Sequence, residues 1–273
     1  MKRKTTYGLA LSGGGARGIA HLGILQALEE NDIIPVVMSG ASMGSLVSVG
    51  YALGLKPKEM LQLIEEEVKP FSLTNTNLSR NGLFSMKKVE KIFREKAVPD
   101  DFSTLNIPVY VTVTNLNTGK FEIHSKGPLV SYTLASATIP LVFKPVVIDD
   151  VYYVDGGLTK NMAAQILEGK CDIVIGINVN HIAQENSFKR MRDVAARTYH
   201  LAVHNTIRDE LDYCNYVVDP PETTKFSPFD FQKAAEIYEI GYREGLKLAE
   251  LLKKEEAKKT SFFSNIFKKT SSK

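Results

Sequence analysis

The chain has 273 residues, 44% of them hydrophobic, which is enough to bury one α/β core, so we expect one folded domain. Two cysteines, Cys171 and Cys214, form neither a disulfide framework nor a metal-binding spacing, so a reducing, cytoplasmic compartment is the default expectation. The net charge of +3 is unevenly spread. Residues 253–273 hold seven lysines and two glutamates, a local +5, which leaves −2 on the rest and gives no support for nucleic-acid binding.

Short β-branched runs alternate with amphipathic stretches, which predicts a mostly parallel sheet covered by helices. In chain order we expect strands at 6–11, 33–39, 109–114, 120–124, 146–154 (one or two strands), 172–179 and 215–218. We expect helices at 17–30, 43–54, 57–68, 85–96, 131–138, 188–212 and 231–254. Residues 70–82 are polar and predict a mobile loop that is a candidate lid. No stretch approaches the roughly 20 apolar residues that span a bilayer, and the basic start has no apolar segment typical of a signal peptide.

The most informative motif is Gly40-Ala41-Ser42-Met43-Gly44, which lies between a predicted strand and a predicted helix. This context is typical of a nucleophile elbow. Gly40 and Gly44 let the strand and helix cross closely, while Ser42 occupies a tight turn with its hydroxyl exposed. The motif therefore indicates a serine nucleophile.

A second motif, Ser12-Gly13-Gly14-Gly15-Ala16-Arg17-Gly18, follows the first predicted strand and opens the first predicted helix. Its main-chain N–H groups suit an oxyanion or a phosphate. The spacing also matches a dinucleotide-binding fingerprint, which needs an acidic residue at the end of the second strand. That strand ends at Met38-Ser39-Gly40 without an acid, so the sequence favours an oxyanion over a nucleotide.

The base for Ser42 is open between a histidine and a carboxylate. Among the histidines, His181 follows a predicted strand and suits a hydrolase-type triad best, whereas His21 reads as a packed or capping residue. The i, i+4 pair His200 and His204 has no third ligand nearby, so we interpret it as a solvated helix face rather than a metal site. The alternative base is Asp155, in Asp155-Gly156-Gly157, provided that burial raises its pKa.

Together these motifs resemble the patatin-like phospholipase family, which combines a glycine-rich oxyanion loop, a Gly-x-Ser-x-Gly elbow and a distant Asp-Gly-Gly. The segments 135–140 and 143–145 resemble the small-residue helix and the Phe-Lys-Pro that precede the aspartate strand in that family. The resemblance covers about residues 6–180. It implies a three-layer α/β/α fold and a Ser42–Asp155 dyad that works without histidine.

The resemblance also implies a role for each remaining motif residue. The oxyanion hole would be formed by Gly13, Gly14 and Gly15. The supporting residues would be Arg17, Gly18, Gly40, Gly44, Gly156 and Gly157. Arg17 would orient the loop or meet a lipid phosphate. No metal or cofactor is implied.

The expected activity is hydrolysis of a lipid acyl ester, of the phospholipase A or lysophospholipase type. Two alternatives stay open: a thioesterase or acyltransferase that uses the same dyad, and a lipid-binding protein without catalysis. Activity measured on a panel of acyl chains and head groups would separate the first alternative from a lipid ester hydrolase. The second is disfavoured because Ser42 and Asp155 are both present.

We divide the chain into a domain at 1–254 and a basic tail at 255–273. In the tail, Phe263, Ile266 and Phe267 fall at i, i+3 and i+4, so a helix there would have one apolar face flanked by lysines. Such a segment suits peripheral contact with the inner face of a membrane, and a solvated, disordered tail is the alternative.

Overall fold

The computed structural model describes residues 3–68, 86–140, 142–188 and 190–270, so the expected loop at 70–82 lies outside the described residues. The strands form one mostly parallel eight-stranded sheet in the order β5-β6-β3-β2-β1-β7-β8, with β4 also paired to β3. Their bounds are β1 Tyr7–Leu11, β2 Pro35–Ala41, β3 Val109–Asn115, β4 Lys120–His124, β5 Val146–Ile148, β6 Val151–Asp155, β7 Ile173–Ile177 and β8 Tyr216–Val218. The predicted mostly parallel sheet is confirmed, with β4, β5 and β6 pairing antiparallel.

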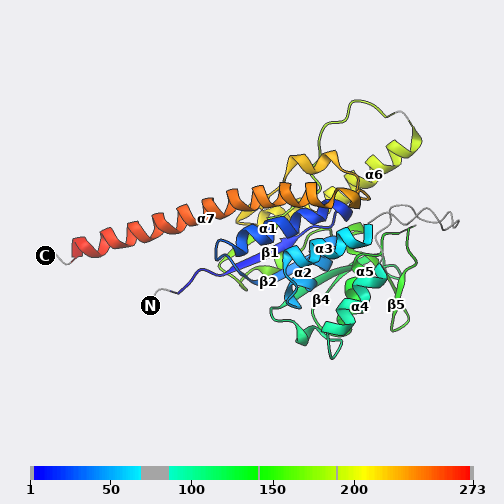
Figure 1. Ribbon diagram of the computed structural model, residues 1–273, viewed down its shortest axis with the longest axis horizontal. Coiled ribbons are helices and arrows are strands. Elements are labelled where there is room, and N and C mark those ends of the chain that lie inside the picture. The colour runs from blue at the N-terminus through cyan, green and yellow to red at the C-terminus, as the bar shows by residue number, and fades with distance from the viewer. Residues whose placement is uncertain (1–2, 69–85, 141, 189, 271–273) are drawn as a thin grey trace.

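The larger hydrophobic core is formed with residues of helices α1 to α5 and α7, and α1 and α7 lie side by side (Figure 1). Their bounds are α1 Ala20–Glu29, α2 Met43–Ala52, α3 Pro57–Val68, α4 Met86–Lys96, α5 Leu129–Ser136, α6 Met191–Asn205 and α7 Ala234–Thr270. The opposite face of the sheet has a smaller core, in which Ala10, Val37 and Val174 pack against Leu167 and Ile207 from shorter segments. The three layers are therefore unequal in thickness.

Strand β3 brings two distant parts of the chain together. Its residues 111–112 pair with both β2 and β4, which therefore lie on opposite edges of it. Its residues 113–115 pair with both β4 and β6, so β6 lies on the same edge as β2. Strand β2 ends opposite Thr112 and β6 ends opposite Val113, so the two carboxyl ends meet head to head.

Two of the predicted helices differ from the structure by more than three residues at one end. The helix expected at 188–212 is α6 followed by a separate 3-10 helix, η5 Arg208–Tyr213. The break lies at Thr206, whose Oγ1 donates to the Val203 carbonyl (2.7 Å) and accepts from the N–H of Asn161 (3.0 Å). Such local side-chain bonds compete with helical ones.

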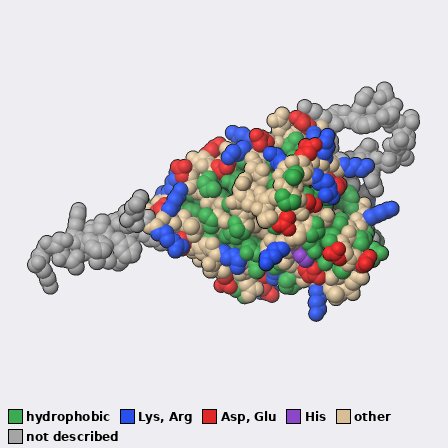
Figure 2. Space-filling model, turned by 90° about the horizontal axis from the view of Figure 1, so that it is seen from below, with side chains coloured by type: hydrophobic (Ala, Val, Ile, Leu, Met, Phe, Trp, Pro, Cys, Tyr) green, Lys and Arg blue, Asp and Glu red, His purple; other side chains and the backbone are tan. Residues whose placement is uncertain are grey.

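The last helix, α7, runs on to Thr270, so the expected boundary at Lys254 falls inside a helix (Figure 1). The side chains beyond Lys258 lie outside the described residues. On the face seen in Figure 2, basic and acidic side chains are interspersed rather than gathered by sign. None of the described helices is both long enough and apolar enough to cross a bilayer.

Candidate active site

Ser42 lies on the sharp turn between β2 and α2, as the elbow motif predicts. Its φ of 51° is in the left-handed region, a strained backbone typical of functional positions. The turn is tight because α2 starts directly above β1. A Cβ on Gly44 would overlap the carbonyl oxygens of Leu11 and Ser12, and one on Gly40 would overlap the backbone of Gly44. The Ser42 N–H donates to Ser136 Oγ (3.0 Å), which fixes the strained peptide.

Asp155 ends β6 and meets Ser42 at the carboxyl end of the sheet. Ser42 Oγ donates to Asp155 Oδ2 over 2.6 Å, and Asp155 Oδ1 accepts from the N–H of Gly157 over 2.8 Å. Asp155 is 3% exposed, and this burial raises the pKa of its carboxyl group to about 6. The hydrogen bonds from Ser42 and Gly157 act in the opposite direction and lower it. Gly156 lets the turn lie against β3, because a Cβ there would overlap the Thr112 carbonyl.

The glycine-rich loop lies beside Ser42, since a Cβ on Gly13 would come within 2.8 Å of the Ser42 Cβ. The N–H of Gly13 points to Asn161, whose Oδ1 and main-chain oxygen lie 3.1 and 3.2 Å away. This differs from the expectation that all three glycines offer a free N–H group. Within the described part of the chain, the N–H groups of Gly14 and Gly15 donate no hydrogen bond.

The supporting residues pack the loop against the rest of the fold. Arg17 is 7% exposed, and its Nε donates to the Phe226 carbonyl (2.7 Å), which ties the glycine loop to the segment that precedes α7. Gly18 allows Met43 to pack closely, since a Cβ there would lie 2.5 Å from Met43 Cγ.

The described contacts connect Ser42 Oγ with Asp155 and with none of the five histidines. His21 is fully buried, and its Nε2 lies 2.8 Å from the Ser12 carbonyl. Desolvation lowers the pKa of His21 to about 4, so the ring is neutral, and the Ser12 carbonyl accepts from Nε2–H. His21 therefore packs behind the glycine loop, as predicted.

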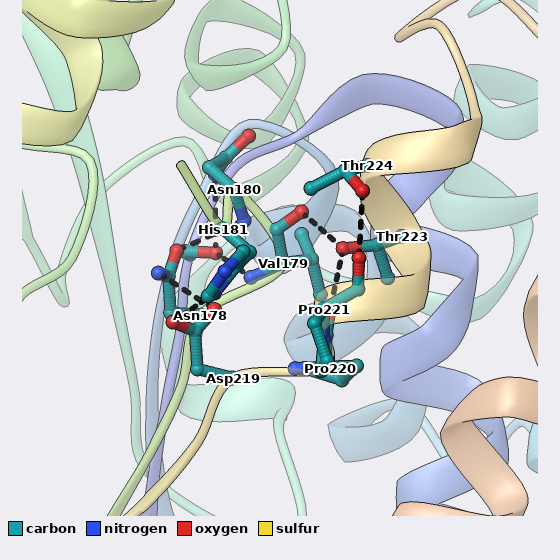
Figure 3. Close-up of polar contacts among 10 residues, drawn as sticks. Asn178, Val179, Asn180, His181, Asp219, Pro220, Pro221, Thr223 and Thr224 are labelled. Atoms are coloured by element: carbon teal, nitrogen blue, oxygen red, sulfur yellow. Dashed lines mark hydrogen bonds and ion pairs between the residues drawn. The ribbon is translucent and has the colours of Figure 1, made fainter. Parts of the chain in front are cut away.

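The other histidines have separate partners. His181 Nδ1 lies 2.9 Å from Asp219 Oδ2, in a polar cluster beyond the ends of β7 and β8 (Figure 3). His124 stacks on Tyr132 with ring centroids 3.7 Å apart. Desolvation, helped by the nearby Arg17 charge, lowers the pKa of His200 to about 4. Among the described residues, no three His, Cys, Asp or Glu side chains lie together as a metal site would need. His200 and His204 therefore have no described third ligand.

Two cavities adjoin the elbow and share Met43 and Leu46 in their walls. The first, about 420 Å³ and partly open to solvent, contains Ser42 and Gly15 among side chains such as Ile139, Phe143 and Phe229. The second, about 520 Å³, lies between α2, α3 and α4, and Lys88 is the one charged residue among its described lining residues. The apolar cavity at Ser42 therefore has a second apolar cavity as its neighbour, with Met43 and Leu46 between them.

Sequence reasoning missed four polar side chains that surround the site. They are Ser12, Ser136, Asn161 and Asn180, all buried and all bonded to the backbone of the elbow or the glycine loop. Ser12 and Ser136 lie within segments that the motif analysis quoted without giving them a role, and Asn161 follows closely after Gly157. Asn180 follows a strand without a motif, and no pattern in the sequence points to it.

Comparison with known proteins identifies relatives of this chain. A family model described as patatin-like phospholipase matches residues 9–167. Lysophospholipase NTE1 of Kluyveromyces lactis is 27% identical over 277 residues, covering 87% of this chain and 19% of that protein. Human patatin-like phospholipase domain-containing protein 6 is 26% identical over 282 residues, covering 88% and 20%.

The chain thus spans about a fifth of the length of these two relatives. Among solved structures, VipD from Legionella pneumophila aligns with a TM-score of 0.52 at 17% identity. The alignment covers 91% of this chain and 67% of that one, a likeness that shows the fold.

Proposed function

The chain belongs to the patatin-like phospholipase family, and from this membership we propose that it hydrolyses lipid acyl esters, with Ser42 as nucleophile and Asp155 as its base. The observation that carries the proposal is the 2.6 Å hydrogen bond from Ser42 Oγ to a buried carboxylate, at the wall of an apolar cavity. A nucleophile and base within hydrogen-bond reach are the geometric requirement for covalent acyl transfer.

The first half of the reaction forms an acyl-enzyme. Ser42 Oγ attacks the ester carbonyl carbon as its proton passes to Asp155 Oδ2. The raised pKa of Asp155, about 6, makes it a stronger base than a solvated carboxylate while leaving it ionised at neutral pH. The carbonyl oxygen becomes an oxyanion, which the N–H groups of Gly14 and Gly15 stabilise. The intermediate then collapses, and the leaving alcohol takes the proton from Asp155.

The second half uses water as the nucleophile. Asp155 accepts a proton from the water as its oxygen adds to the acyl carbon, and the same N–H groups stabilise the second oxyanion. Ser42 then leaves and recovers its proton from Asp155, which frees the fatty acid. The proposal is tested by labelling the protein with a fluorophosphonate and identifying the modified residue. Modification of another serine, or of none in an active preparation, would contradict it.

The apolar cavities support a lipid as the substrate. Because Met43 and Leu46 line both, the two cavities are adjacent, and an acyl chain bound at Ser42 would reach the second cavity by displacing these two side chains. Transfer of a chain from water into such a space is favourable by about 0.8 kcal/mol for each buried CH₂ group. We therefore place the acyl chain, rather than the alcohol, in the second cavity.

Filling the second cavity is expected to shorten the preferred acyl chain. Val89 lines it from α4, so Val89→Trp should lower kcat/KM for a C12–C16 p-nitrophenyl ester at least about tenfold and change that for a C4 ester less than about twofold. Val98→Trp is the matched control, because Val98 is 75% exposed. Equal effects on short and long esters would show that the chain does not enter this cavity.

For the tail we retain the proposal of contact with an anionic membrane. Removing residues after Lys258 deletes the apolar positions but keeps Glu255, which contacts the Tyr216 hydroxyl. The truncated protein should bind anionic vesicles less tightly at low salt, with unchanged hydrolysis of soluble short-chain esters. Cosedimentation with vesicles measures this, and neutral vesicles are the control. Equal binding by both proteins would leave the tail as solvated chain.

A further inference from the structure

Asn180 contacts the loop that forms the proposed oxyanion hole, although it lies 167 residues further along the chain. It follows β7, and its Nδ2 donates to the carbonyl oxygen of Gly13 over 2.5 Å. Ser12 Oγ donates to the same oxygen over 3.0 Å. Both side chains are buried, with Ser12 inaccessible and Asn180 7% exposed. The Gly13 carbonyl is therefore held from one side by two donors.

Holding this carbonyl also fixes the next N–H group. The carbonyl of Gly13 and the N–H of Gly14 belong to one planar trans peptide and point in opposite directions. Since the oxygen faces Asn180 and Ser12, the Gly14 N–H faces away from them, and no described acceptor binds it. Asn161 fixes the preceding peptide in the same way, by accepting from the Gly13 N–H.

A peptide between two glycines needs such fixing. Neither Gly13 nor Gly14 has a Cβ, so the backbone torsions on both sides of their shared peptide are permissive. A flip of this peptide would turn the Gly13 carbonyl, instead of the Gly14 N–H, toward the substrate. A carbonyl dipole in that orientation repels a developing oxyanion, whereas an N–H stabilises it.

We propose that Asn180 is a positioning residue that keeps the Gly13–Gly14 peptide in the orientation in which the Gly14 N–H binds the oxyanion. This inference rests on the proposed hydrolase function. Asn180 touches no substrate atom in this role. It acts through the main chain of the loop, so its removal should affect the transition state more than the bound substrate.

Asn180 is itself anchored by the cluster in Figure 3. Its N–H donates to Asn178 Oδ1 (3.0 Å), and Asn178 Nδ2 donates to Asp219 Oδ1 (3.1 Å). The other carboxylate oxygen, Asp219 Oδ2, pairs with His181. The pair of Asp219 with His181, the histidine that sequence reasoning considered for a catalytic triad, thus lies at the outer end of a network that supports Asn180.

The test compares Asn180→Ala and Asn180→Asp with the wild-type full chain, using a soluble short-chain p-nitrophenyl ester. The alanine variant loses the donor, and the aspartate variant keeps the shape but places an acceptor against the Gly13 carbonyl. We expect kcat to fall about tenfold to a hundredfold with KM within about twofold, and the aspartate variant to be the slower. Affinity for a trifluoromethyl ketone, which forms a tetrahedral oxyanion on serine, should fall by the same factor as kcat/KM.

Asn215→Ala is the matched control, because Asn215 accepts from the N–H of Val174 near the other end of β7 (2.7 Å). It should lower the unfolding midpoint without lowering kcat. If the Asn180→Ala variant is folded and retains kcat, or if Asn215→Ala lowers kcat equally, the positioning role is wrong while the hydrolase function stands. A wild-type chain that neither hydrolyses esters nor reacts with a fluorophosphonate would overturn both.

Discussion

Replacing Ser42 by alanine is expected to lower kcat for a soluble acyl ester by at least about 10⁴-fold, because no acyl-enzyme can form. The change removes one hydroxyl and keeps a Cβ in the same backbone conformation, so the unfolding midpoint should move little. Steady-state kinetics, fluorophosphonate labelling and thermal unfolding measure the three quantities. Ser48→Ala, one turn along α2, removes a hydroxyl that donates to the Gly44 carbonyl and should keep both activity and labelling.

A Ser42→Ala variant with wild-type turnover would remove the basis of the proposed mechanism. Residual activity at the level of the buffer-catalysed reaction, with a folded protein, is the expected result.

Replacing Asp155 by asparagine is expected to lower kcat by about 10³-fold or more, because an amide accepts no proton from Ser42. The shape is kept, and the amide oxygen still accepts from the Gly157 N–H. In the wild type, kcat/KM should rise with pH around the raised pKa of about 6, since the base works when ionised. The variant should lack this rise.

His181→Ala, at the outer end of the Asn180 network, should lower kcat less than about tenfold. A larger loss of kcat in His181→Ala than in Asp155→Asn would favour a histidine triad.

The Asp155 carboxylate should make the folded protein less stable as the pH rises. The pKa of Asp155 is about 6 when folded and near 3.8 when unfolded, so between these values the folded state binds more protons. The free energy of unfolding therefore falls as the pH rises from about 4 through 6, by about 3 kcal/mol for this group alone. Urea unfolding at pH 8 should find the Asp155→Asn variant more stable than the wild type, although it is inactive.

Local sequence predicted the turn at Ser42 and its surroundings because the elbow and the glycine loop are continuous segments. The turn at Ser42 follows from Gly40 and Gly44, and the helix after it from the residues that follow. The pairing of Ser42 with Asp155 lay beyond local reasoning, since it depends on β2 and β6 sharing one edge of β3. The family resemblance supplied that pairing where spacing alone left His181 open.

The details of the oxyanion loop were also beyond the sequence. Three glycines predict free N–H groups, but Asn161 occupies the one at Gly13, and Asn161 comes from a different part of the chain. The helix expected at 188–212 was too long for a similar reason. Thr206 bonds to Asn161, and a tertiary contact of this kind leaves no periodic signal.

The head-to-head arrangement of β2 and β6 on one edge of β3 has a consequence for when the protein becomes reactive. The serine and the glycine loop lie within the first 44 residues, whereas the carboxylate lies 113 residues after the serine. In the proposed mechanism the nucleophile is thus synthesised before its base, and it stays unactivated until the hairpin that carries Asp155 joins β3. A slip of β6 by one residue along β3 would displace the carboxylate by about 3.3 Å, beyond hydrogen-bond reach of the hydroxyl. The proposed esterase activity would therefore be a direct readout of correct sheet assembly.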